Sequence, residues 1–309
     1  MMVKWPVKFV LFIVVILFVS LFTGNLLFEM LYKKNIYGQS GGNINYYLKQ
    51  PKSEALILGS SRAHHHVIPD SISSRTFNLS HNGMRIGFQA GLIEVLSKTK
   101  LLPDSLLLLH IEPESFVAPN RDLLLEFQYL KYYYNSNKYI KSNIDKLSKF
   151  EKVKYWLSIY RFNGTIPSLI RNSLKSVKKP NRHDLGFAPL DAGLPGRIEK
   201  AQKDYDLDPH DFRKSMAHAF LNHILAACKE QKVKVVLFTS PYYRTTSHPI
   251  ASKHFLEYIE SMNVDYFYYP SKQIDELKEL NAWHDQSHLS SHGAAIFSSL
   301  LAKDLMELK

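Results

Sequence analysis

The sequence has very little cysteine: Cys228 is the single one in 309 residues. One cysteine cannot form an internal disulfide bond, so packing and hydrogen bonding must hold the fold together. Proteins on either side of a membrane can lack disulfides, and the cysteine content therefore does not choose a compartment. With 45% hydrophobic and 22% charged residues, the composition is that of an ordinary globular protein.

Signatures of nucleic-acid binding are also missing. The chain has no zinc-finger spacing, no RNP-like strand and no arginine-rich tract. It is nevertheless basic, with a formal net charge of +11. Such an excess permits contact with nucleic acid, anionic lipid or an anionic polymer. Without the motifs, nucleic acid is the poorest of the three, and we expect no nucleic-acid partner.

Charged residues are absent from Phe9 to Phe28. About 20 residues of helix rise roughly 30 Å, the thickness of a hydrocarbon core. A buried core helix would be shorter and would show a polar face. A cleaved signal peptide is the alternative, but the run exceeds a typical apolar core and no small-x-small site follows. We predict an uncleaved membrane anchor over residues 1–31.

The charges that flank this run are nearly balanced. Lys4 and Lys8 precede it, and Lys33 and Lys34 follow it. A short N-terminal tail before a large domain favours a cytoplasmic N-terminus, which makes the chain a single-pass protein of the cell membrane with an extracytoplasmic domain. Residues 32–52 are polar and glycine-containing, and are predicted to be a linker. Residues 53–309 should form the folded domain.

Short apolar runs alternate with helical patterns in the remainder. We expect strands at 55–58, 76–80, 105–111, 233–239 and 265–269, and helices at 86–98, 211–231, 250–262 and 291–307. Alternation of this kind predicts an α/β fold, with a parallel five-stranded, flavodoxin-like sheet in a three-layer α/β/α arrangement. Residues 114–210 interrupt this alternation of strands and helices, and are predicted to be a helical insertion after the third strand. The insertion is either a packing cap or a lid that faces the substrate.

Two distant stretches carry residues suited to acyl transfer. The strand at 55–58 ends on Gly-Ser-Ser, which either makes a turn or presents Ser61 as a nucleophile at the carboxyl end of a buried strand. Near the C-terminus, Asp285 and His288 lie three residues apart. His288 could take the serine proton while Asp285 fixes the imidazole tautomer. The alternative is a turn-capping aspartate beside an ordinary histidine.

These stretches resemble the motif blocks of the SGNH (GDSL-type) hydrolase superfamily. Gly-x-Ser at 59–61 is similar to the first block and makes Ser61 the counterpart of the nucleophile. The segment Phe-Asn-Leu-Ser-His-Asn-Gly at 77–83 is similar to the second, whose glycine, here Gly83, gives a backbone N–H to the oxyanion hole. Asp-x-x-His at 285–288 matches the last block. The resemblance covers residues 53–309 apart from the insertion.

The third block of that family, Gly-x-Asn-Asp, is not recognisable. In its place stands His-Ile-Glu-Pro-Glu-Ser at 110–115, without the asparagine that completes the oxyanion hole. Loss of one such donor costs roughly a hundred- to thousand-fold in rate. Asn82 is the candidate substitute.

The resemblance is to the membrane-anchored branch that takes part in O-acylation of cell-surface polymers. It implies a serine esterase or O-acyltransferase that acts on an acylated cell-envelope polysaccharide or similar polymer, with an integral-membrane acyltransferase as a partner. The missing asparagine leaves an alternative, a catalytically weak or inactive accessory or binding subunit of an envelope-modification complex.

The histidine run at 64–66 raises a rival interpretation as a metal site. Adjacent residues cannot all face one way in a helix or strand, and His-Glu-x-x-His is absent. We therefore expect no metal and no cofactor, and histidines that shape the mouth of the cleft. Arg62 either holds an anionic substrate or points to solvent. Ser60 should turn toward the sheet or brace the turn by hydrogen bonding to the backbone, and its replacement should cost about 1 kcal/mol.

Overall fold

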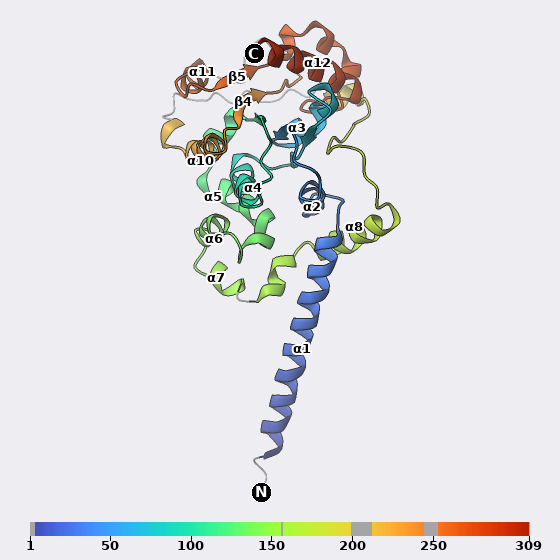
Figure 1. The fold of residues 1–309 in the computed structure, drawn as a ribbon, viewed down its shortest axis with the longest axis vertical. Helices are drawn as coiled ribbons and strands as arrows, with labels where there is room; N and C mark the ends of the chain where they lie inside the picture. Colours follow the sequence, from blue (N-terminus) through green and yellow to red (C-terminus); the bar gives the residue numbers. More distant parts are fainter. Residues whose placement is uncertain (1–3, 156, 199–211, 244–252, 309) are drawn as a thin grey trace. The chain divides into compact units, whose positions relative to one another are not determined.

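The computed structural model describes residues 4–155, 157–198, 212–243 and 253–308. Contacts divide the chain into two compact units. The first, here the anchor unit, comprises Met1–Tyr46 and Lys131–Asn181. The second, here the sheet unit, comprises Tyr47–Leu130 and Arg182–Lys309. Figure 1 shows the course of the chain through both.

The sheet unit contains a five-stranded sheet in the order β2-β1-β3-β4-β5, and every neighbouring pair is parallel. The strands are β1 (Ala55–Leu58), β2 (Thr76–Asn78), β3 (Leu106–His110), β4 (Lys234–Thr239) and β5 (Asp265–Tyr268). The prediction of an α/β fold with a parallel sheet is confirmed. Strand β2 ends earlier than expected, at Asn78, although the backbone that follows it still bonds to β1, with Leu79 N–H donating to Ile57 O at 2.9 Å.

Helices surround this sheet (Figure 1). Those of the sheet unit are α3 (Ser61–His66), α4 (Ile86–Lys98), α5 (Asn120–Leu125), α9 (Pro195–Ile198), α10 (Met216–Glu230), α11 (Lys253–Glu260) and α12 (Ser291–Glu307). Helix α12 packs Phe297 and Leu301 into the same core cluster as Ile57 and Leu108. This burial explains why β1 and the first four residues of β3 are apolar, as in strands that are covered on both faces.

Two of the four predicted helices have the expected bounds, and the other two are shorter than expected. Helix α10 begins at Met216 because Ser215 caps it, its Oγ accepting from His218 N at 3.1 Å. Helix α11 is described from Lys253, and residues 250–252 of the prediction lie outside the described residues. Helices α4 and α12 match the prediction at both ends.

The anchor unit differs from the domain boundaries expected from sequence. Its helices are α1 (Lys4–Lys34), α6 (Lys138–Asp145), α7 (Glu151–Lys154) and α8 (Ile166–Lys178), and the expected linker holds α2 (Gly42–Tyr47). Residues 131–181 belong with α1 and not with the sheet. The physical reason is a small core in which Phe162 and Leu169 pack with Tyr32.

Helix α1 is long and apolar enough, by length and composition, to cross a membrane. The stretch concerned is Val7–Lys34, and none of its most apolar window is buried in the structure. It is the one such helix in the part of the chain that the structure describes. The predicted apolar N-terminal helix is therefore present, and it continues past residue 31 to Lys34.

Candidate active site

The exit from β1 is too tight for any side chain at Gly59. A Cβ there would lie 2.5 Å from His110 Cβ and 2.6 Å from Ala63 Cβ. Ser60 follows as the N-cap of α3, and Ser61 is the first residue of that helix. The sequence thus turns directly from a buried strand into a helix, and the turn holds Ser61 half-buried at the carboxyl end of β1.

Ser60 points away from Ser61 and braces the turn. Its hydroxyl donates to Glu112 Oε1 at 2.6 Å and accepts from Arg62 N–H at 3.3 Å. The expectation that Ser60 supports the turn is confirmed. Its partner, a carboxylate from the loop after β3, was not foreseen.

The loop between Trp283 and Leu289 closes on itself. These two residues form an antiparallel bridge, and His284 N–H donates to His288 O at 2.8 Å. Buried Trp283 holds the base of the loop, since its indole N–H donates to Leu277 O at 2.8 Å. Such a closed loop limits the positions that the side chains between its ends can take.

Asp285 organises the inside of this loop. Its Oδ1 accepts from the backbone N–H of Ser287 at 2.8 Å and of His288 at 2.9 Å. Partial burial raises the pKa of Asp285. Hydrogen bonds from the His288 side chain and from Ser287 lower it by more than burial raises it, so the pKa ends well below its usual value. The carboxylate therefore stays ionised at physiological pH.

The structure brings Ser61, His288 and Asp285 together. His288 Nδ1 lies 2.9 Å from Asp285 Oδ2, and His288 Nε2 lies 2.8 Å from Ser61 Oγ. An ionised Asp285 can only accept, so it selects the tautomer with the proton on Nδ1. Nε2 is then left as the acceptor for the serine hydroxyl proton, which is the geometry that general-base activation requires.

His66 links the helix of Ser61 to the loop of His288. It is fully buried, and its Nε2 accepts from Leu289 N–H at 3.0 Å. Burial holds the pKa of His66 well below its ordinary value, so the ring stays neutral and keeps the lone pair that this bond needs. Sequence reasoning noticed the histidine run but missed this link, because the partner is a backbone group distant in sequence.

His64 and His65 each have a different partner. His64 Nδ1 lies 2.7 Å from Asn82 Oδ1, and His65 Nδ1 lies 2.7 Å from Ala188 O. The three imidazoles of the run thus point to three separate groups. Within the described ranges, no group of three His, Cys, Asp or Glu residues is arranged to hold a metal ion.

The second block begins in β2, and its residues 79–83 lie in the loop that follows. His81 N–H donates to Gly59 O at 2.9 Å, so this loop runs beside the exit from β1. Gly83 has φ of +71° in a turn closed by Met84 N–H to His81 O, a conformation that favours glycine. Asn82, through its bond to His64, is tied to the helix that carries Ser61.

The expectation that Arg62 points to solvent is wrong. Its side chain is 2% exposed and meets neither solvent nor an open cleft. The guanidinium lies 3.3 Å from Glu112 Oε1 and donates to Ser240 O at 3.2 Å. It also stacks 3.6 Å above the ring of Tyr242. These contacts commit the Arg62 guanidinium to neighbours within the protein, and Glu112 is its ionic partner.

The end of the expected insertion borders this site. Besides the contact of Ala188 with His65, Asp191 O lies 2.8 Å from His284 Nδ1, and Gly193 N–H donates to Trp283 O at 2.9 Å. This part of the insertion belongs to the sheet unit. It contacts both α3 and the loop between Trp283 and Leu289.

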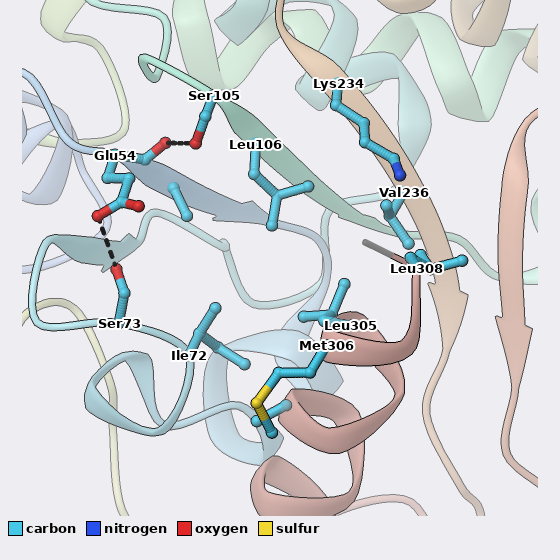
Figure 2. Close-up of a pocket in the computed structure, with 12 residues that line it drawn as sticks. Glu54, Ile72, Ser73, Ser105, Leu106, Lys234, Val236, Leu305, Met306 and Leu308 are labelled. Carbon is cyan, nitrogen blue, oxygen red and sulfur yellow. Dashed lines mark hydrogen bonds between the residues drawn. The ribbon is translucent and has the colours of Figure 1, made fainter.

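A pocket of about 270 Å³ lies at the opposite edge of the sheet (Figure 2). Its lining includes Ala55, Leu106 and Lys234, the first residues of β1, β3 and β4, with Leu305 and Met306 of α12. Ligands of parallel sheets bind at the carboxyl ends of strands. The pocket is mostly apolar and is far from the chemistry that Ser61 could support.

The buried histidines predict a loss of stability in mild acid. Burial lowers the pKa of His64 from 6.5 to about 4. Below pH 6.5 the unfolded chain therefore takes up a proton that the folded chain refuses until about pH 4, so stability falls across this window. At pH 5 the loss from His64 should be about 2 kcal/mol.

Replacement of His64 by asparagine should remove this contribution and keep a donor toward Asn82. We expect the difference in unfolding free energy between pH 7.5 and pH 5 to shrink by about 2 kcal/mol, measured by denaturant titration. An unchanged difference would mean that His64 titrates normally in the folded chain.

Comparison with known proteins adds no relative: no protein-family model matches this chain, and the search of curated proteins finds no significant match.

Proposed function

We propose that this protein is a membrane-anchored serine esterase or O-acyltransferase of the SGNH type. One observation carries the proposal: an unbroken hydrogen-bonded path from Asp285 through His288 to Ser61, with donor–acceptor distances of 2.9 and 2.8 Å. Ser61 lies near the start of the sheet unit's sequence, whereas Asp285 and His288 lie near its end. Buried neighbours hold the α3 helix of Ser61 and the loop of His288 in place. Such an arrangement is suited to activating a hydroxyl as a nucleophile.

In the first half-reaction, Ser61 Oγ attacks the carbonyl carbon of an ester while its proton passes to His288 Nε2. Asp285 stabilises the imidazolium that forms. The tetrahedral intermediate then breaks the bond to the alcohol oxygen, which leaves with the proton from His288. The products are a free hydroxyl and an acyl group on Ser61.

In the second half-reaction, water or an acceptor hydroxyl attacks the acyl group. His288 takes its proton and returns it to Ser61 Oγ. Water gives hydrolysis, and a polymer hydroxyl gives transfer. As the first residue of α3, Ser61 has a backbone N–H that the helix does not use, and with Gly83 N–H it is our candidate for the oxyanion hole.

The setting of the site supports the choice of substrate. The strand order β2-β1-β3-β4-β5 supports our proposal of a flavodoxin-like, three-layer arrangement, of the kind that SGNH enzymes share. Helix α1 is our candidate for a single-pass anchor in the cell membrane, with the sheet unit outside the cytoplasm. The net charge of +11 favours an anionic polymer. We therefore propose an acylated envelope polysaccharide as substrate, and an integral-membrane acyltransferase as partner.

One observation favours a second candidate, an accessory subunit with little activity. The third-block position holds Glu112, whose carboxylate is committed to Arg62 and Ser60 and cannot donate to an oxyanion. A site with one donor fewer could still bind an acylated polymer.

A fluorophosphonate probe separates the two candidates. If Ser61 is activated, the probe should label the full-length protein in detergent, and peptide mapping should find the adduct on Ser61. A protein that takes no label at neutral pH would favour the accessory role.

A further inference from the structure

Helix α8 in the anchor unit carries three parallel stripes of side chains. The first is Leu169, Ser173 and Ser176, all buried. The second is Ile170, Leu174 and Val177, which are 43%, 59% and 74% exposed. The third is Arg171, Lys175 and Lys178. Each stripe follows helical spacing, so α8 exposes its most apolar face beside its most basic one.

The buried stripe faces the carboxyl end of α1. Ser173 Oγ donates to Leu31 O at 3.0 Å, and Ser176 Oγ accepts from Ile36 N–H at 3.0 Å. Small hydroxyl side chains allow the two elements to approach closely and satisfy backbone groups at the end of α1. Figure 1 shows α8 at this end of the long helix. The apolar stripe is therefore left outside the core of the unit.

The segment before α8, η4 (Ser158–Phe162), extends this surface along α1. Ile159 packs on Gly24, where a Cβ would lie 3.0 Å from Ile159 Cδ1. Arg161 pairs with Glu29 at 2.9 Å. Gly24 lies inside the uncharged run that ends at Phe28, about 6 Å along the helix from its end. If α1 spans a membrane, η4 must therefore reach the level of the lipid headgroups.

We propose that α8 is an interfacial helix that binds the surface of an anionic bilayer. This inference rests on the proposed membrane span of α1. Its apolar stripe would enter the boundary between headgroups and acyl chains, and its basic stripe would contact lipid phosphates. The side chains of Phe150, Val153 and Leu157, within or beside α7 and η4, are also exposed.

Lipid fits this surface better than a protein partner would. Helix α8 contacts the carboxyl end of α1, where the proposed span would leave the membrane, and Lys175 and Lys178 lie beside its apolar stripe. In a soluble helix, a stripe with helical spacing faces the core, yet here the buried stripe has two serines and the exposed one has none. A bilayer would cover this stripe as soon as α1 inserts.

Single-cysteine probes in the full-length protein test the depth of α8. The native Cys228 is buried, and burial raises its pKa to about 12, so it should label poorly. The variants are Leu174→Cys and Val177→Cys on α8, Val15→Cys within α1, and, as a control, Lys303→Cys at an exposed position of α12. Each carries a nitrobenzoxadiazole label in vesicles of phosphatidylcholine, with or without phosphatidylglycerol.

Lipids with a nitroxide near the headgroup should quench the α8 labels by at least about half, and more strongly with phosphatidylglycerol present. Deep nitroxides should quench the label at Val15, and neither should affect the control. Quenching at Val15 without quenching at α8 would overturn the interfacial helix and leave the span intact. No quenching at Val15 would overturn the span and this inference together. Equal quenching in both lipids would overturn the preference for anionic lipid.

Discussion

Replacement of Ser61 by alanine should reduce kcat/KM on a small ester by at least about a thousand-fold and abolish phosphonate labelling. The reason is that His288 Nε2, 2.8 Å from the serine oxygen, would have no hydroxyl to activate. Stability should change little, because Ser61 is half-buried and loses only a small polar group. Hydrolysis of a chromogenic ester and a denaturant titration measure the two effects.

The matched control is the neighbouring Ser60→Ala, which should show the reverse pattern. Ser60 donates to a carboxylate at 2.6 Å and caps α3, so its loss should cost about 1.5–3 kcal/mol, more than the sequence alone suggested. Activity should stay within about tenfold of the native value, since Ser61 and His288 remain. Full activity in Ser61→Ala would end the catalytic proposal, and the accessory role would then be favoured.

Replacement of Arg62 by methionine should cost about 3–5 kcal/mol of unfolding free energy. The guanidinium is 2% exposed, and its removal would leave Glu112 without its charged partner near the end of β3. A similar loss is expected for any partner deleted from a buried ion pair. Denaturant titration of the full-length protein would measure it.

The double variant Arg62→Met, Glu112→Gln should recover part of this loss, because no unpaired charge then remains. Recovery would establish the structural role of Arg62. If Arg62→Met instead kept its stability and raised KM for an anionic substrate, the substrate-binding role expected from sequence would be restored.

The sequence alone determined the sheet, the apolar N-terminal helix and the identity of the three triad candidates. These depend on local signals. An apolar run of four residues, the short Gly-x-Ser turn and the Asp-x-x-His spacing are all readable within a few positions. Parallel connectivity then carries the ends of β1 and the final loop to one edge of the sheet, so even their meeting could be expected.

Only the tertiary structure decided the roles of Arg62, Glu112 and His66. Each depends on a partner distant in sequence: Arg62 on Glu112 after β3, and His66 on a backbone N–H after the final loop. Likewise, residues 131–181 join α1 and not the sheet, because Phe162 and Leu169 pack with Tyr32. The local sequence indicates whether a residue is suited to burial or carries a charge. Its interaction partner is decided by the tertiary structure, because the energies of burial and ion pairing depend on which surfaces come into contact.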